Sequence, residues 1–266
     1  MGESIVITSG KGGVGKTTTT ANIGTALALM GKKVCLVDTD IGLRNLDVIM
    51  GLENRIIYDI VDVMEERCKL KQALIKDKRF EALSLLPAAQ TSDKSSLTPE
   101  GMVNIVQELK QEFDYIVIDC PAGIEQGYKN AVAAADKAIV ITTPEKASVR
   151  DADRIIGLLE QEEIEHRRLV VNRIRNHMVE QGDMLDVDEI VAILSIDLLG
   201  IVADDDEVIK ASNNGEPIAF QPSTKPSIAY RNIARRILGE SVPLQSFDEH
   251  KGILTRVKEF FGIRSK

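Results

Sequence analysis

Short runs of Val, Ile and Leu alternate with longer amphipathic stretches along this chain of 266 residues. Runs that are apolar at nearly every position are typical of strands buried on both faces, and apolar residues three or four apart are typical of helices. We expect strands at 4–9, 33–38, 82–87, 114–119, 137–142, 168–172 and 198–203. We expect helices at 16–31, 58–65, 98–112, 125–134, 147–162, 186–194, 205–213 and 226–238. The alternation predicts an α/β fold: a mostly parallel, twisted sheet of about seven to eight strands with helices on both faces.

The link between the first strand and the first helix has the sequence GKGGVGKT at positions 10–17, which fits G-x-x-x-x-G-K-[ST]. Glycines let the backbone curl until its N–H groups point at phosphate oxygens, and Lys16 supplies a positive charge to the β- and γ-phosphates. The Thr17 hydroxyl is a candidate Mg²⁺ ligand. The pattern predicts a P-loop NTPase. The residues expected to bind the nucleotide here are Lys11, Gly12, Gly13, Val14, Gly15, Lys16, Thr17 and Thr18.

Carboxylates follow two of the predicted strands. Asp38 ends the strand at 33–38 and Asp40 follows it, and Asp119 ends the strand at 114–119. Right-handed crossovers bring the carboxyl ends of parallel strands to one edge of the sheet, where ligands of such folds bind. We expect Asp119 and Asp40 to hold Mg²⁺ through water, and Asp40 to orient the attacking water. The alternative for Asp38 is a structural role, in which it holds the P-loop in shape without touching the reacting centre.

Lys11, a second lysine at the start of the loop, makes the motif K-G-G-x-G-K-T. In this motif and in the segments DTDIGLRNLD at 38–47 and ASNNGEP at 211–217, the chain resembles the deviant P-loop ATPases of the ParA/MinD family. The resemblance implies hydrolysis of ATP with Mg²⁺, with Lys11, Lys16, Asp40 and Asp119 as the catalytic set. It also implies a homodimer in ATP, in which Lys11 reaches the partner's nucleotide.

The base contact is expected at Asn172, which ends the strand at 168–172. Its side chain offers both a donor and an acceptor to the edge of adenine, and the family places an asparagine that binds the base at the matching point. Members of the family often carry a proline in the later loop, where this chain has Ala203. That difference leaves the second base contact open.

The C-terminal segment at 251–266 is basic and amphipathic. On a helical wheel its apolar residues Ile253, Leu254, Val257, Phe260 and Phe261 share an arc of about 120°, with Ile263 following them. The segment holds five Lys or Arg and one Glu, a charge of +4, whereas the whole chain carries −8. A basic amphipathic helix on an acidic body is typical of an anchor on an anionic membrane surface. The alternative is a terminal helix that docks on the protein's own core.

These features predict three regions: a P-loop ATPase domain at 1–240, a linker at 241–250 and a membrane-targeting helix at 251–266. Among family members, the resemblance is to those that place the division site, which implies a MinC-like division inhibitor and MinE or another topological factor as partners. A cytoplasmic protein, peripheral on the inner face of the cell membrane, is expected. The strongest rival is a DNA-segregation ATPase of the ParA type, but the acidic body gives no reason to expect nucleic acid as a partner. Three cysteines without a C-x-x-C pair argue against an iron–sulfur site.

Overall fold

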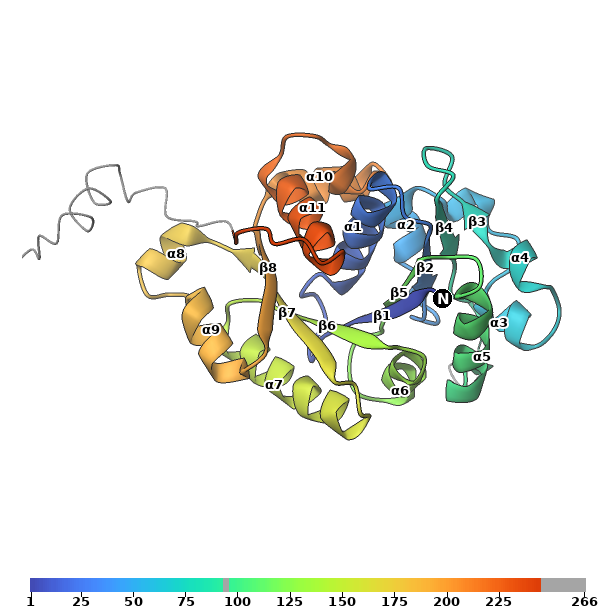
Figure 1. The fold of residues 1–266 in the computed structure, drawn as a ribbon, viewed down its shortest axis with the longest axis horizontal. Coiled ribbons are helices and arrows are strands. Elements are labelled where there is room, and N and C mark those ends of the chain that lie inside the picture. Colours follow the sequence, from blue (N-terminus) through green and yellow to red (C-terminus); the bar gives the residue numbers. More distant parts are fainter. Residues whose placement is uncertain (93–95, 245–266) are drawn as a thin grey trace, which may run out of the picture.

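The computed structural model describes residues 1–92 and 96–244, and in them one sheet of eight strands runs through the molecule (Figure 1). The strand order is β3-β4-β2-β5-β1-β6-β7-β8, and each neighbouring pair is parallel except β3 with β4. The strands span β1 Glu3–Thr8, β2 Val34–Asp38, β3 Ile75–Lys76, β4 Leu83–Leu86, β5 Tyr115–Asp119, β6 Lys137–Thr142, β7 His166–Ile174 and β8 Asp197–Ala203.

Helices cover both faces of the sheet, as Figure 1 shows. One face packs against α1 Lys16–Leu29, α2 Leu46–Met50, α10 Asp206–Asn213, the 3-10 helix η3 Ile218–Phe220 and α11 Lys225–Ile237. The other face packs against α3 Ile60–Met64, α4 Leu70–Ala73, α5 Pro99–Leu109, α6 Gln126–Ala133, α7 Lys146–Gln161 and α9 Val187–Leu194. The short elements η1 Glu53–Arg55 and α8 Asn176–Glu180 lie in connections.

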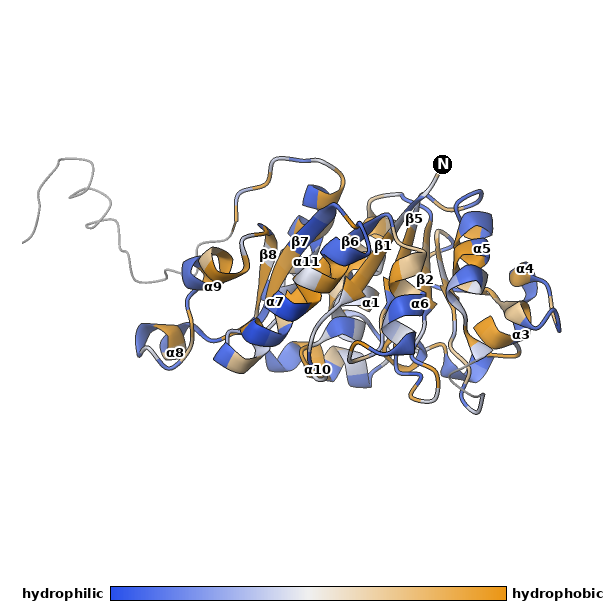
Figure 2. Ribbon diagram, turned by 90° about the horizontal axis from the view of Figure 1, so that it is seen from below, coloured by the Kyte–Doolittle hydropathy of each residue, from blue (hydrophilic) through white to orange (hydrophobic). Residues whose placement is uncertain are grey.

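Successive residues of each central strand enter opposite cores. In β5, Ile116 and Ile118 join the core under α5 to α7, whereas Val117 joins the core under α1 and α11. Both faces of the strand are therefore buried, which is why the sequence shows continuous apolar runs instead of alternation. Figure 2 shows this as strands that are orange along their length between helices with blue outer surfaces.

All seven predicted strands and all eight predicted helices are present, with ends shifted by a few residues. The expected α/β fold is confirmed. Sequence patterning missed the edge strand β3 and the short helices α2, α4 and α8. The predicted membrane-targeting helix at 251–266, and most of the predicted linker at 241–250, lie outside the described residues.

The β3 edge of the sheet is only two residues long. Ile75 and Lys76 pair antiparallel with Leu85 and Ser84 of β4. The guanidinium of Arg55 donates a hydrogen bond of 2.6 Å to the carbonyl oxygen of Lys76. A side chain thus occupies a backbone acceptor of this edge strand.

The carboxyl ends of the strands meet at one edge of the sheet, as expected. Asp119 of β5 is aligned with Ile7 of β1 on one side and with Asp38 of β2 on the other. The loop that follows β1 leads directly into α1. The P-loop and the strand-end carboxylates therefore lie at the same edge of the sheet.

Candidate functional site

The P-loop connects the end of β1 at Thr8 to the start of α1 at Lys16. Gly13 and Gly15 have φ angles of 79° and 98°, a left-handed conformation that residues with a Cβ rarely adopt. A Cβ on Gly15 would also lie 2.4 Å from Nδ2 of Asn172. These glycines therefore cannot be replaced without moving the loop, as the motif predicted.

The two lysines of the loop differ sharply in their surroundings. Lys16 is 7% exposed and its Nζ donates a hydrogen bond of 3.0 Å to Oγ of Ser9. Ser9 in turn donates 2.8 Å to the carbonyl oxygen of Lys11. The side chain of Lys11 is exposed. An ammonium carries three N–H donors, so this buried cation can donate to an anionic ligand as well as to Ser9.

Asp119 joins the P-loop helix to the central strands. Its Oδ1 accepts a hydrogen bond of 3.0 Å from the hydroxyl of Thr20, and its side chain is 2% exposed. Burial raises the pKa of Asp119 to about 6, and hydrogen bonds from Thr17 and Thr20 and the charge of Lys16 oppose that rise. The charge of Asp40 also acts on Asp119, so the three motifs share one electrostatic environment.

Asp38 holds a different segment from the one expected. Its Oδ1 accepts 2.9 Å from the backbone N–H of Asp40, and its Oδ2 accepts 3.4 Å from the N–H of Leu46. These bonds shape residues 40–46, after β2, a role of Asp38 that the sequence did not indicate. Burial, and after it the charge of Asp119, raises the pKa of Asp38 well above its usual range.

Asn172 lies against the P-loop at the end of β7. It is 5% exposed, and its Nδ2 donates a hydrogen bond of 2.8 Å to the carbonyl oxygen of Val14. Asn172 also lines a cavity of about 340 Å³ beside the loop. The remaining lining residues are Gly15, Thr18, Arg173, Arg175, Ala203, Asp204, Asp205, Asp206, Val208, Ile209, Ser212, Asn213 and Tyr230. The structure thus brings Asn172, Thr18 and Ala203 together, and it gives Asn172 a contact with the loop that the sequence did not indicate.

A bulge in β7 presents Asn172 and Arg173 to this cavity. The pairing of β7 with β8 shifts register between Val171 and Ile174, and Arg173 has a φ of 57°. Non-glycine residues in this conformation are uncommon, and bulges often turn side chains toward functional sites. Sequence reasoning missed Arg173, as well as the ion pair of 2.6 Å between Arg175 and Asp204 at the rim. No periodic signal marks a bulge, although the polar Asn-Arg step that ends an apolar run could have drawn attention to it.

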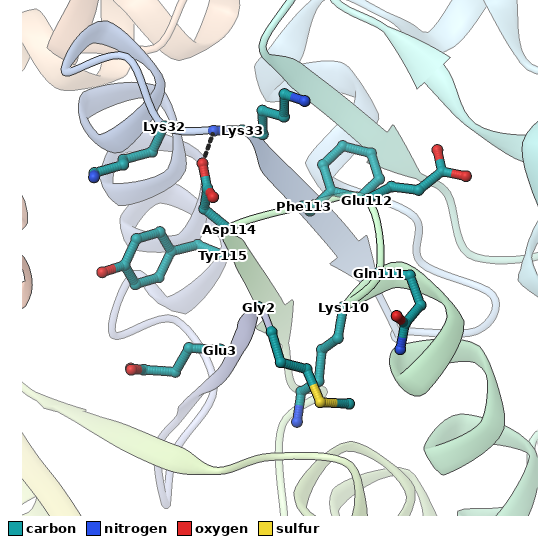
Figure 3. A pocket seen from close by; sticks show the side chains of 11 residues that line it. Gly2, Glu3, Lys32, Lys33, Lys110, Gln111, Glu112, Phe113, Asp114 and Tyr115 are labelled. Carbon is teal, nitrogen blue, oxygen red and sulfur yellow. Dashed lines mark hydrogen bonds between the residues drawn. The ribbon is translucent and has the colours of Figure 1, made fainter.

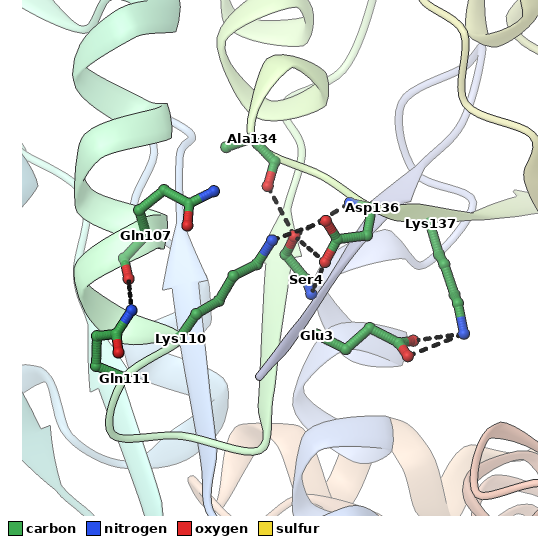
Figure 4. A network of polar contacts seen from close by, with 8 residues as sticks. All are labelled: Glu3, Ser4, Gln107, Lys110, Gln111, Ala134, Asp136 and Lys137. Atoms are coloured by element: carbon green, nitrogen blue, oxygen red, sulfur yellow. Dashed lines mark hydrogen bonds and ion pairs between the residues drawn. The ribbon is translucent and has the colours of Figure 1, made fainter. Parts of the chain in front are cut away.

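A larger cavity, of about 680 Å³, lies at the opposite edge of the sheet (Figure 3). Lys32, Lys33, Glu112 and Asp114 are among its lining residues, so cations and anions balance there. Nearby, Lys110, the residue after α5, forms an ion pair of 2.7 Å with Asp136, which also accepts from the N–H and hydroxyl of Ser4 (Figure 4). These contacts join α5, β1 and the start of β6. The strand-end carboxylates and the P-loop lie at the other edge, so we place the chemistry there despite the smaller cavity.

Residues 5–218 match the family described as the CobQ/CobB/MinD/ParA nucleotide binding domain. The septum site-determining protein MinD of Bacillus subtilis (strain 168) is 76% identical over 268 residues, which cover 100% of both chains. The chain belongs to the MinD family of P-loop ATPases. The MinD protein of Synechocystis sp. is 52% identical and covers 97% of this chain and 98% of its own.

Solved structures agree with this membership. MinD in a MinC:MinD cell division protein complex from Aquifex aeolicus superposes with a TM-score of 0.85 and 51% identity, over 92% of this chain and 98% of its own. MinD of Pyrococcus horikoshii, complexed with Mg-ADP, gives 0.81 and 28%, over 89% of this chain and 96% of its own. The chain is therefore a nucleotide-binding ATPase of the MinD family, and the predicted fold and enzyme class are confirmed. Among the described helices, none has the length and apolarity needed to cross a bilayer.

Proposed function

We propose that this ATPase dimerises when it binds ATP, attaches to the membrane through residues 251–266 and recruits a division inhibitor that controls septum placement. The observation that carries the ATP-dependent step is the contrast between a buried Lys16 and an exposed Lys11 on one loop. Lys16 is positioned to serve the nucleotide of its own subunit. The side chain of Lys11 is exposed to solvent, so it can reach the nucleotide bound by the other subunit of the proposed dimer.

The phosphates belong in the P-loop beside Lys16. The left-handed Gly13 and Gly15 turn the loop backbone inward, and the buried ammonium of Lys16 would pair with the β- and γ-phosphates. The donor set fits Mg²⁺, because Thr17 and Asp119 already interact and both offer oxygen atoms. Thr17 would be the direct ligand, and Asp119 and Asp40 would bind through water. When bound, Mg²⁺ neutralises charge that develops on the phosphate oxygens.

Asp40 is proposed to orient the attacking water. Its backbone N–H is held by Asp38 and its charge acts on Asp119, so it lies at the reacting edge of the sheet. A carboxylate that holds a water in line with the γ-phosphate lowers the barrier by positioning, with little covalent chemistry of its own. Lys11, Lys16 and Asp119 complete the proposed catalytic set.

The base is proposed to occupy the cavity of about 340 Å³ beside Asn172 and Thr18. The amide oxygen of Asn172 would accept from the exocyclic amine of adenine, while its Nδ2 holds Val14. Adenine also suits the acidic start of α10, because Asp204 and Asp205 are acceptors at the same rim.

The proposed membrane attachment and the proposed partners are based on the sequence and on the relatives of this chain. The apolar arc of Ile253, Leu254, Val257, Phe260 and Phe261, extended by Ile263, carries basic residues on its flanks, which suits an anionic lipid surface. One short helix binds weakly, whereas two helices on one dimer bind far better through effective concentration. A MinC-like inhibitor is proposed as the cargo because a solved relative is a MinC:MinD complex. MinE or another topological factor would set position.

Co-sedimentation with vesicles that contain anionic lipid tests the proposal. We expect the protein in the pellet with Mg-ATP and in the supernatant with Mg-ADP, and Lys16→Ala in the supernatant with either. Plasmid DNA offered in parallel should stay unbound. Binding to DNA in ATP without binding to vesicles would replace this function with DNA segregation.

A further inference from the structure

Arg79 lies in the loop between β3 and β4, at the junction of three segments that are distant in sequence. Its Nη2 donates a hydrogen bond of 2.7 Å to the carbonyl oxygen of Met50, the last residue of α2. Its Nη1 donates 3.0 Å to the carbonyl oxygen of Gly215, just beyond α10. One guanidinium thus binds the ends of two helices.

Further contacts hold this guanidinium in place. Its Nε and Nη2 donate 3.0 Å and 2.7 Å to the two carboxylate oxygens of Asp77, whose side chain is 1% exposed. Its Cζ lies 4.6 Å from the centre of the Phe220 ring, which stacks on Phe80 at 5.2 Å. A rigid, planar fork that satisfies several acceptors at once is a role that Lys cannot reproduce.

The two helix ends that Arg79 binds also touch each other. Gly51 and Gly215 have φ angles of 64° and 68°, and a Cβ on Gly215 would lie 2.7 Å from Cα of Gly51. Backbone packs on backbone here with no side chain between the two residues. Any side chain at Gly215 would push the ends of α2 and α10 apart.

Each of the joined helices belongs to a different part of the site. The segment that leads into α2 carries Asp40, and the N–H of Leu46 at the start of α2 donates to Asp38. On the other side, α10 contributes Val208, Ile209, Ser212 and Asn213 to the lining of the 340 Å³ cavity. This helix ends at Asn213, two residues before Gly215. We infer that Arg79 is a positioning residue that couples the base cavity to the segment carrying the water-orienting Asp40. The inference rests on the proposed location of the base and of the water.

The test compares kcat and KM for Mg-ATP and Mg-GTP at a temperature at which every variant is folded. For Arg79→Gln we expect kcat with ATP to fall about tenfold and the preference for ATP over GTP to fall about fivefold, within the range of typical coupling between sites. Gly215→Ala disturbs the same junction while Arg79 stays intact. It should therefore lower kcat with ATP and the preference for ATP over GTP in the same way. Phe220→Leu, which keeps the hydrogen bonds of Arg79, should give a smaller loss of both.

Arg67→Gln is the matched control, because Arg67 also binds two carboxylates, Asp62 and Glu65, at an exposed position. It should leave both quantities unchanged. A lower melting temperature of Arg79→Gln with unchanged kcat and unchanged preference would overturn the inference and leave Arg79 a stabilising residue. The same preference in Gly215→Ala as in the wild type would also overturn it. If the wild type itself does not prefer ATP over GTP, the base assignment fails and the inference fails with it.

Discussion

Asn172 and Val14 are joined by a hydrogen bond of 2.8 Å that ties the end of β7 to the backbone of the P-loop. The residue proposed to contact the base therefore also fixes the loop proposed to bind the phosphates. The shape of the loop and the contact with the base depend on one side chain. Its loss should therefore weaken binding of both the phosphates and the base.

We predict that Asn172→Ala weakens ATP binding by roughly tenfold or more, since a buried carbonyl left without its donor costs about 1–3 kcal/mol. Titration with a fluorescent ATP analogue measures this. Asn54→Ala is the control, because Asn54 is exposed and bonds to the side chain of its neighbour Glu53. Affinity equal to the wild type would mean that Asn172 supports neither the loop nor the base.

Asp119→Asn should make the nucleotide-free protein more stable. Burial raises the pKa of Asp119 from 3.8 to about 6, so the folded state binds this proton more tightly than the unfolded state does. The contribution of Asp119 to stability is therefore present at low pH and is lost as the pH rises from about 4 through 6. Asparagine stays neutral, so the gain in melting temperature should be larger at pH 7.5 than at pH 5. An equal gain at both values would contradict the raised pKa.

Asp40→Ala should keep ATP binding and dimerisation but reduce hydrolysis by about 100-fold or more, as expected when a group that positions or deprotonates the nucleophile is lost. The variant should accumulate as a dimer on size exclusion in ATP. Asp188→Ala, on the exposed face of α9, is the control. Turnover near that of the wild type would show that another group holds the water.

Lys11→Ala should weaken ATP-dependent dimerisation by at least about tenfold, which corresponds to about 1.4 kcal/mol, and should leave ATP binding to the monomer nearly unchanged. The reason is that the side chain of Lys11 is exposed and does not support its own loop. Analytical ultracentrifugation in ATP measures the dimer, with Lys71→Ala on α4 as an exposed control. Full dimerisation of Lys11→Ala would remove its proposed role across the interface.

Phe260→Asp should abolish vesicle binding in ATP while ATP binding and dimerisation persist. The change places a carboxylate in the apolar arc of residues 251–266. Moving this charge out of water to the lipid surface costs roughly a few kcal/mol. Lys258→Gln should weaken binding only in part, and its deficit should shrink at high salt because ions screen the charge. If Phe260→Asp still sediments with anionic vesicles, another part of the chain is the anchor.

The sequence allowed the central strands to be predicted because β1, β5 and β6 are buried on both faces and have continuous apolar runs. Strand β3 has no such run: Ile75 is apolar and Lys76 is not, and the pair forms only because β4 lies beside it. Helices such as α2 and α8 span five residues, too short to establish a helical period.

The predicted site residues around the P-loop were brought together because the rules for parallel sheets place strand ends at one edge. The contacts of Asp38 with residues 40–46 were not predicted, since the backbone N–H groups that a buried carboxylate meets depend on the path of the following loop. Arg79 was missed for a similar reason. It contacts Gly215, which is 136 positions away, and no local pattern predicts such a meeting.

The short edge strand β3 has a consequence for the proposed attachment to a membrane. Sheet edges with free backbone groups can pair with the edges of other copies, and confinement to a membrane would raise the rate of such encounters. Here the edge strand has two residues, and the guanidinium of Arg55 already occupies the carbonyl oxygen of Lys76. This edge therefore offers little backbone for pairing between copies, so the proposed crowding on a membrane should not cause aggregation through β3.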